Sequence, residues 1–301
     1  MNTLRLQTAL DSTPFPGKIT KVFSSKFGHV YDVGIAHLDS GEDVVIKIKD
    51  NPRSRKYSTT YSREVEYKNL RALERIDSSL IPKAIYYKDG VLLMTLIQGE
   101  PLRMVNQDDL NTDAFVTMGA TLRKINDLKS NELSHLIRFD SFRKFLEHEF
   151  ELFFNERVNP ELLPLSFYED FREKMFGIVN DEHPADIVLV AKDAYGAENV
   201  LVKDKNISGL IDFEDLMFAP RLLQLRPPVD KKYMSEYNKG YGQEIFKKNY
   251  YQPHLDILKA ISTLRALYVA DEEDSEDFKQ VCIKTFNELM QNLECSLHIV
   301  F

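Results

Sequence analysis

The sequence predicts an α+β protein in which a small β-rich N-terminal lobe precedes a larger, mostly helical C-terminal lobe. Short β-type runs dominate before residue 100, among them KITKVFS, VYDVGIAHL and DVVIKIK. Amphipathic helical patterns dominate after it. Between the two, QGEPL interrupts both patterns with a glycine and a proline. We therefore expect one lobe over residues 1–98 and a second over residues 99–301.

The N-terminal lobe is expected to contain one helix and a hairpin. SREVEYKNLRALERI is helical in pattern, with Val65, Ala72, Leu73 and Ile76 at spacings near 3.6. KAIYYKDGVLLMTLI predicts two strands that turn at Asp89-Gly90, because this dipeptide favours the positive φ angles of a tight hairpin turn.

The C-terminal lobe is expected to be helical apart from three short strands. DAFVTMGATLRKINDL and SFRKFLEHEFELFF are amphipathic, and the last 50 residues predict two more helices. The helix over DAFVTMGATLRKINDL should bury Phe115, Met118, Leu122 and Ile125. The strands are expected at residues 187–190, 200–202 and 207–211.

Composition narrows the functional class. Hydrophobic residues make up 43% of the chain and charged residues 29%, as in an ordinary globular protein, and no apolar run reaches the roughly 18 residues of a membrane span. The N-terminus lacks the pattern of an export signal, so we expect a cytoplasmic protein with no membrane partner. A net charge of −8 argues against nucleic-acid binding and is compatible with a cationic ligand.

Polar residues at the ends of two predicted strands indicate phosphoryl transfer. Asp193 follows the strand expected at residues 187–190, and Asn199 lies six residues later. Asp212 follows the strand expected at residues 207–211. Lys47 lies on the third predicted strand, with Lys49 as the alternative by alternation, and Glu64 opens the next helix. Transfer from a nucleotide needs a lysine for the phosphates, a carboxylate for that lysine, oxygen ligands for a divalent metal and a base.

The chain resembles the aminoglycoside phosphotransferase and choline-kinase-like family, small-molecule relatives of protein kinases. The resemblance rests on five segments in order: SREVEYKNLRALE, GVLLMTLIQGEPL, VLVAKDAYGAENVLV, ISGLIDFED and YNKGYGQ. Together they span about residues 18–245. It implies a bilobal protein-kinase-like fold and a transferase that uses ATP, or GTP, with Mg²⁺.

The resemblance also implies a role for each site residue. Asp193 would be the catalytic base, and Asn199 and Asp212 would bind Mg²⁺. The remaining residues would bind the nucleotide: Lys47 at the phosphates, Glu64 orienting Lys47, Met94, Thr95, Leu96 and Ile97 at the adenine, and Ser25 and Gly28 over the phosphates.

The catalytic segment departs from the family pattern in two ways. The family usually has His-Gly-Asp with an asparagine five residues after the aspartate, whereas this chain has Ala191-Lys192-Asp193 and a spacing of six. Either Asp193 is the base and the loop is one residue longer, or Ala194 occupies the base position and the enzyme is impaired. The strand run ends directly before Ala191, which favours Asp193.

The resemblance implies transfer of the γ-phosphate to a hydroxyl of a small molecule, with an aminoglycoside or similar antibiotic as the leading acceptor and antibiotic resistance as its consequence. Two alternatives stay open: a kinase of a metabolite alcohol of the choline, homoserine or sugar type, and a pseudokinase that acts through partners. Six of the seven residues at 271–277 are acidic. They form either a solvated loop or an attractive surface for a cationic acceptor.

Overall fold

The computed structural model describes residues 8, 11, 19–24, 32–48, 63–76, 78–128, 133–157, 162–179, 186–192, 194, 196–224, 229–242, 251–272 and 275–294. It divides into two compact units. The first comprises residues 1–137, 188–218 and 224–244, and the second residues 138–187, 219–223 and 245–301. These two units do not coincide with the two lobes expected over residues 1–98 and 99–301. The division into those lobes therefore stays a prediction.

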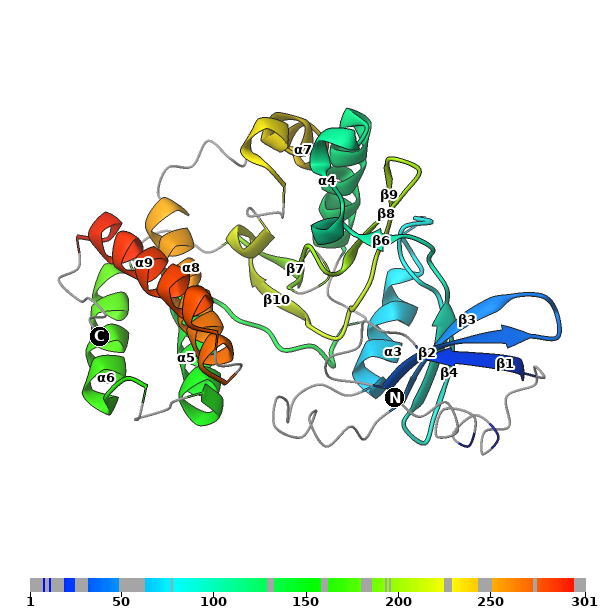
Figure 1. Cartoon of the computed structure of the whole chain (residues 1–301), viewed down its shortest axis with the longest axis horizontal. Helices are drawn as coiled ribbons and strands as arrows, with labels where there is room; N and C mark the ends of the chain where they lie inside the picture. Colours follow the sequence, from blue (N-terminus) through cyan, green and yellow to red (C-terminus); the bar gives the residue numbers. More distant parts are fainter. Residues whose placement is uncertain are drawn as a thin grey trace. The chain divides into compact units, whose positions relative to one another are not determined.

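A five-stranded antiparallel sheet forms much of the first unit, with strand order β1-β2-β3-β5-β4 (Figure 1). Its strands are β1 (Ile19–Ser24), β2 (Asp32–Leu38), β3 (Asp43–Ile48), β4 (Ala84–Lys88) and β5 (Val91–Thr95). Alternate residues of β3, namely Val44, Ile46 and Ile48, are buried in an apolar cluster with residues of β2 and β5. Because side chains alternate along a strand, Lys47 points to the opposite face of the sheet.

The predicted hairpin and helix of this region are both present. β4 and β5 turn at Asp89 and Gly90, whose φ angles are +50° and +81°, as a tight turn with two positive φ angles requires. Helix α3 (Arg63–Leu73) contacts β4 and β5 (Figure 1). Of the four apolar residues spaced near 3.6 in this segment, Leu73 and Ile76 are buried, whereas Val65 and Ala72 are half-buried. The buried residues of α3 are Arg63, Glu66, Asn69, Leu70 and Leu73.

Two small sheets contain the remaining strands of the described residues. One has the order β6-β8-β9 and joins β6 (Glu100–Pro101), β8 (Val200–Lys203) and β9 (Asn206–Leu210). The other pairs β7 (Ile187–Ala191) with β10 (Leu216–Pro220). The chain therefore leaves β7 for the segment that contains Asp193, returns through β8 and β9, and reaches Asp212 between β9 and β10.

Two helices of the first unit pack closely on each other. They are α4 (Thr112–Asn126) and α7 (Met234–Tyr241), which lie side by side in Figure 1. A Cβ atom on Gly119 of α4 would lie 2.3 Å from the carbonyl oxygen of Tyr237, so only glycine permits this approach. The predicted apolar face of α4 is confirmed, since Phe115, Met118, Leu122 and Ile125 are all buried.

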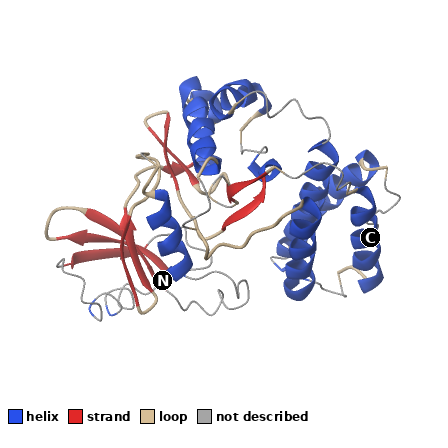
Figure 2. Cartoon of the chain, turned by 180° about the vertical axis from the view of Figure 1, so that it is seen from behind, coloured by secondary structure: helices blue, strands red, loops and turns tan. Residues whose placement is uncertain are grey.

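The second unit is mainly helical. Its helices are α5 (Phe142–Arg157), α6 (Leu165–Ile178), α8 (Tyr251–Glu272) and α9 (Glu276–Asn292), and they lie beside one another in both views (Figure 2). Aromatic rings fill part of the space between them, as where the ring centres of Phe171 and Phe286 lie 5.5 Å apart.

Four short 3₁₀ turns complete the described structure: Leu102–Met104, Gln107–Asp109, Arg221–Gln224 and Lys231–Tyr233. Among the described residues, no helix is both long and apolar enough to cross a membrane.

Candidate active site

Lys47 is the centre of a charged cluster in the first unit. Its Nζ atom lies 2.7 Å from Oε1 of Glu66 and 2.9 Å from Oδ1 of Asp212, and it donates a hydrogen bond to each. Lys47 and Glu66 are buried, whereas Asp212 is half-buried. Strand β3, helix α3 and the turn after β9 thus each contribute one charged side chain to the same point.

The carboxylate that orients Lys47 is Glu66, and the expectation for Glu64 is corrected. Glu64 is exposed and pairs with Lys68, which lies one turn later on the same helix, at 2.7 Å. The physical reason is the orientation of α3. Leu70 and Leu73 face the interior, and a residue four positions before Leu70 shares that face, which selects Glu66 and excludes Glu64. The period of the two leucines was the signal in the sequence that could have identified Glu66.

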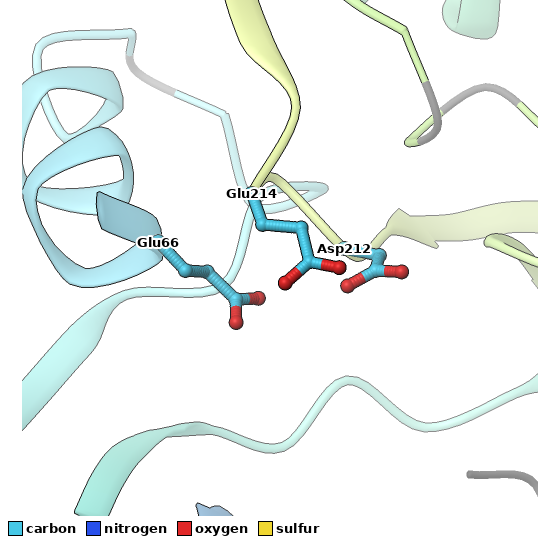
Figure 3. A group of neighbouring side chains, drawn as sticks. All are labelled: Glu66, Asp212 and Glu214. Atoms are coloured by element: carbon cyan, nitrogen blue, oxygen red, sulfur yellow. The ribbon is translucent and has the colours of Figure 1, made fainter. Parts of the chain in front are cut away.

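Three carboxylates form a group that can hold a metal ion. One oxygen atom from each of Glu66, Asp212 and Glu214 lies within 4.8 Å of the others. Figure 3 shows their carboxyl groups turned toward one another from α3 and from the turn after β9. Arg63 lies near this group, with its Nη2 atom 3.6 Å from Glu214. Glu214, which the sequence analysis did not assign to the site, is thus part of it.

The chemistry of these ligands fits Mg²⁺. Magnesium prefers hard oxygen donors, and one or two carboxylates together with substrate phosphates are its usual ligands. Among the described residues, the three carboxylates pair with two cations, Lys47 and Arg63. Asp212 is the least buried of the three acids, so its oxygen atoms are the most accessible to a metal ion.

The cluster shifts the protonation of its members. Burial alone lowers the pKa of Lys47, but the charges of Asp212, Glu66 and Glu214 outweigh burial and hold the pKa above its ordinary value. Lys47 therefore stays a cation suited to binding phosphate. Burial also raises the pKa of Glu214 to about 8, with the charge of Asp212 acting in the same direction and that of Lys47 opposing it.

Asn199 lies beside the residue that precedes Asp212. Its backbone carbonyl accepts a hydrogen bond from the amide of Ile211 at 2.9 Å. The structure thus brings together Asn199 and Asp212, the two residues predicted to bind metal. Coordination by the Asn199 side chain stays a prediction.

The predicted base, Asp193, lies outside the described residues, but both of its neighbours are described. The amide of Lys192 lies 3.4 Å from the carbonyl oxygen of Asp215, so this segment runs next to the turn that carries Asp212. Ala194 is fully buried. A residue that accepts a proton from a bound substrate must be accessible to that substrate, so the burial of Ala194 favours the register with Asp193 as the base.

The segment predicted to bind adenine forms the end of β5 and the connector after it. Met94 is buried and pairs with Val45 of β3. The amide of Thr95 donates a hydrogen bond to the carbonyl of Lys83, and its hydroxyl accepts one from the amide of Lys83. Leu96 and Ile97 are half-buried. Their contact with adenine stays a prediction, and Ser25 and Gly28 lie outside the described residues.

The acidic segment at residues 271–277 is described only in part. Asp271 forms an ion pair with Lys279 of α9 at 2.8 Å, and the amide of Ser275 donates to the carbonyl of Ala270. Asp271 is therefore partly neutralised. Glu273 and Asp274 lie outside the described residues, so attraction of a cationic acceptor stays a prediction.

Residues 26–225 of the chain match the family described as "Phosphotransferase enzyme family". This range covers more than half of the 301 residues and includes Lys47, Glu66, Asn199 and Asp212. The predicted family resemblance and the predicted class of enzyme, a small-molecule phosphotransferase, are thereby confirmed at the level of the family. No curated protein matches the chain in sequence.

Solved structures share the fold at low sequence identity. The gentamicin complex of APH(2″)-IIa has a TM-score of 0.64 at 16% identity, with 95% of this chain and 96% of that chain covered. The macrolide 2′-phosphotransferase MphH from Brachybacterium faecium has a TM-score of 0.63 at 13% identity, with coverages of 95% and 98%. Spectinomycin phosphotransferase APH(9)-Ia, bound to ADP and spectinomycin, has a TM-score of 0.62 at 17% identity, with coverages of 96% and 94%. The predicted α+β fold of the protein-kinase type is confirmed.

Proposed function

The chain belongs to the phosphotransferase enzyme family, and on this premise we propose that it transfers the γ-phosphate of ATP, with Mg²⁺, to a hydroxyl of a small molecule. The observation that carries the proposal is the position of Lys47 between Glu66 and Asp212. This arrangement supplies a phosphate-binding cation and a metal-binding carboxylate at one point, as transfer from a nucleotide requires.

Five residues have a defined task in this reaction. Lys47 binds the phosphates of ATP, and Glu66 holds the Lys47 ammonium in place. Asp212 and Asn199 hold Mg²⁺, which when bound neutralises charge on the phosphates. Asp193 accepts the proton of the acceptor hydroxyl as its oxygen attacks the γ-phosphorus and ADP leaves.

The leading acceptor is an aminoglycoside or a similar hydroxylated antibiotic. Support comes from the structures of the same fold, which include a gentamicin complex, a macrolide phosphotransferase and a spectinomycin phosphotransferase. The net charge of −8 is compatible with a cationic acceptor. These acceptors differ in charge, so charge distinguishes among them in an experiment.

The proposal is tested by ADP release from MgATP across a panel of acceptors. The panel contains gentamicin, spectinomycin, a macrolide and, as metabolite alcohols, choline, homoserine and a sugar. MgGTP in place of MgATP tests the choice of nucleotide. We expect acceptor-dependent ADP release with at least one antibiotic, and a phosphorylated product by mass spectrometry.

The other outcomes separate the alternatives. Turnover with a metabolite alcohol alone would keep the phosphotransferase but replace the antibiotic. MgATP that raises the melting temperature without turnover of any acceptor would favour a pseudokinase, in line with Ala191-Lys192 in place of His-Gly. No effect of either nucleotide on melting or turnover would contradict the proposal.

A further inference from the structure

The backbone of Asp212 adopts a conformation that needs support. Its φ angle is +69°, in the left-handed region that few residues other than glycine adopt. Conformations of this kind persist where the surrounding structure holds them in place. Hydrogen bonds to the residues directly after Asp212 identify the group that holds this turn.

Asn69 binds this turn from helix α3. It is fully buried and lies three residues after Glu66. Its Nδ2 atom donates a hydrogen bond to the carbonyl oxygen of Phe213 at 2.7 Å and lies 3.4 Å from that of Glu214. Those carbonyls belong to the two residues that follow Asp212, so the bond fixes the backbone that carries the carboxylate.

His135 in turn orients Asn69. Its Nε2 atom lies 2.9 Å from Oδ1 of Asn69. The amide nitrogen of Asn69 faces Phe213, so its oxygen, Oδ1, faces His135. An amide oxygen accepts hydrogen bonds, so Nε2 of His135 must carry the proton of this bond. The loop of His135 is itself anchored, since the carbonyl of Ile137 accepts a hydrogen bond from the amide of Phe218 on β10. The loop is thus attached both to α3 and to the strand that leaves the Asp212 turn.

We propose that Asn69 and His135 are positioning residues that hold the turn at residues 212–214 so that the Asp212 carboxylate is presented to Mg²⁺. The inference rests on the proposed function, because it assumes that Asp212 binds the metal. Helix α3 then positions two residues of the site with side chains on one of its faces. Through Glu66 it holds Lys47, and one turn later, through Asn69, it holds Asp212.

The test measures metal-dependent nucleotide binding by the full chain, without catalysis. Isothermal titration gives the affinity for a non-hydrolysable ATP analogue with and without Mg²⁺, and the ratio is the gain due to the metal. Asn69→Ala should lower this gain by about tenfold, the lower end of what loss of an outer-shell partner costs a metal site. His135→Ala should lower it by a smaller factor, and His135→Gln, which keeps a donor near Nε2, should restore it.

A matched control separates positioning from stability. Leu73 lies on the same helix, is fully buried and carries no hydrogen-bonding side chain. Leu73→Ala should therefore lower the melting temperature but retain the gain from Mg²⁺. His135 is exposed, so its two variants test the inference even if Asn69→Ala does not fold.

Each result decides the inference. A gain from Mg²⁺ that is equal in wild type, Asn69→Ala and His135→Ala would overturn it and leave Asn69 a purely structural residue. Should Asn69→Ala not fold, equal gains in wild type and His135→Ala would overturn it. A wild-type protein that binds the analogue equally with and without Mg²⁺ would overturn the metal-dependent function as well. The two failures are therefore distinguishable in the same experiment.

Discussion

Lys47 and Asp212, 165 residues apart in the sequence, form an ion pair with 2.9 Å between Nζ and Oδ1. The pair joins the residue expected to bind phosphate to the residue expected to bind metal. Removal of Lys47 would leave Glu66 and Asp212 without the cation that they share. The structure thus places the two residues with proposed roles within hydrogen-bonding distance of each other.

The first prediction separates two glutamates of one helix. Glu66→Gln should lower kcat/KM for ATP on the order of 10²-fold, because Lys47 loses the carboxylate that fixes its position. Glu64→Gln is the matched control and should change it by no more than about twofold, because Glu64 is exposed and contacts only Lys68 among the charged groups of the helix. Steady-state kinetics with varied ATP provides the measurement. The reverse order of effects would return the role to Glu64.

A second prediction concerns the metal ligand. Asp212→Asn should leave the fold intact, because asparagine tolerates the left-handed φ of +69°. Turnover should nevertheless fall by at least about 10²-fold, since the variant lacks the negative oxygen that stabilises the metal and the developing charge. Circular dichroism and ADP release provide the two readouts. Activity close to wild type would contradict the assignment of Asp212.

The third prediction identifies the base. Asp193→Ala should lower kcat by about 10²–10⁴-fold with little change in ATP affinity, because general-base catalysis acts on the transition state. Ala194→Gly is the comparison and should retain the ATP affinity and most of kcat. If the parent protein is inactive and Asp193→Ala changes nothing, the impaired register is correct.

A fourth prediction tests the packing of α4 on α7. Gly119→Ala should destabilise the protein by about 1–3 kcal/mol, because the added methyl group would lie 2.3 Å from the carbonyl oxygen of Tyr237. Gly177→Ala on α6 is the control, since no atom lies within 4 Å of a Cβ at that position, and alanine should stabilise that helix slightly. Urea unfolding of both variants provides the comparison. Equal stabilities would show that α4 and α7 adjust at no cost.

Local sequence signals determined most of the secondary structure. Asp89-Gly90 specified the β4–β5 turn because its two positive φ angles suit few other residues. The apolar spacing of Phe115, Met118, Leu122 and Ile125 specified the face of α4 that is buried. The polar residues that follow β7 and β9 likewise marked where the chain leaves its strands. These features depend on neighbours within a few residues, so the sequence alone contains them.

The tertiary structure decided which of these residues meet. The spacing of Leu70 and Leu73 favours Glu66 over Glu64 as the partner of Lys47, but only the packing of α3 on the sheet brings Glu66 to Lys47. The hydrogen bond from Asn69 to Phe213 joins residues 144 positions apart. The burial that raises the pKa of Glu214 likewise comes from the folded structure. Side-chain direction on a helix changes by 100° per residue, so the face that packs selects the functional residue. The sequence by itself indicated most of the elements, though not β10, α6 or α7. It also determined the chemistry available to the site, and long-range packing decided which side chains share it.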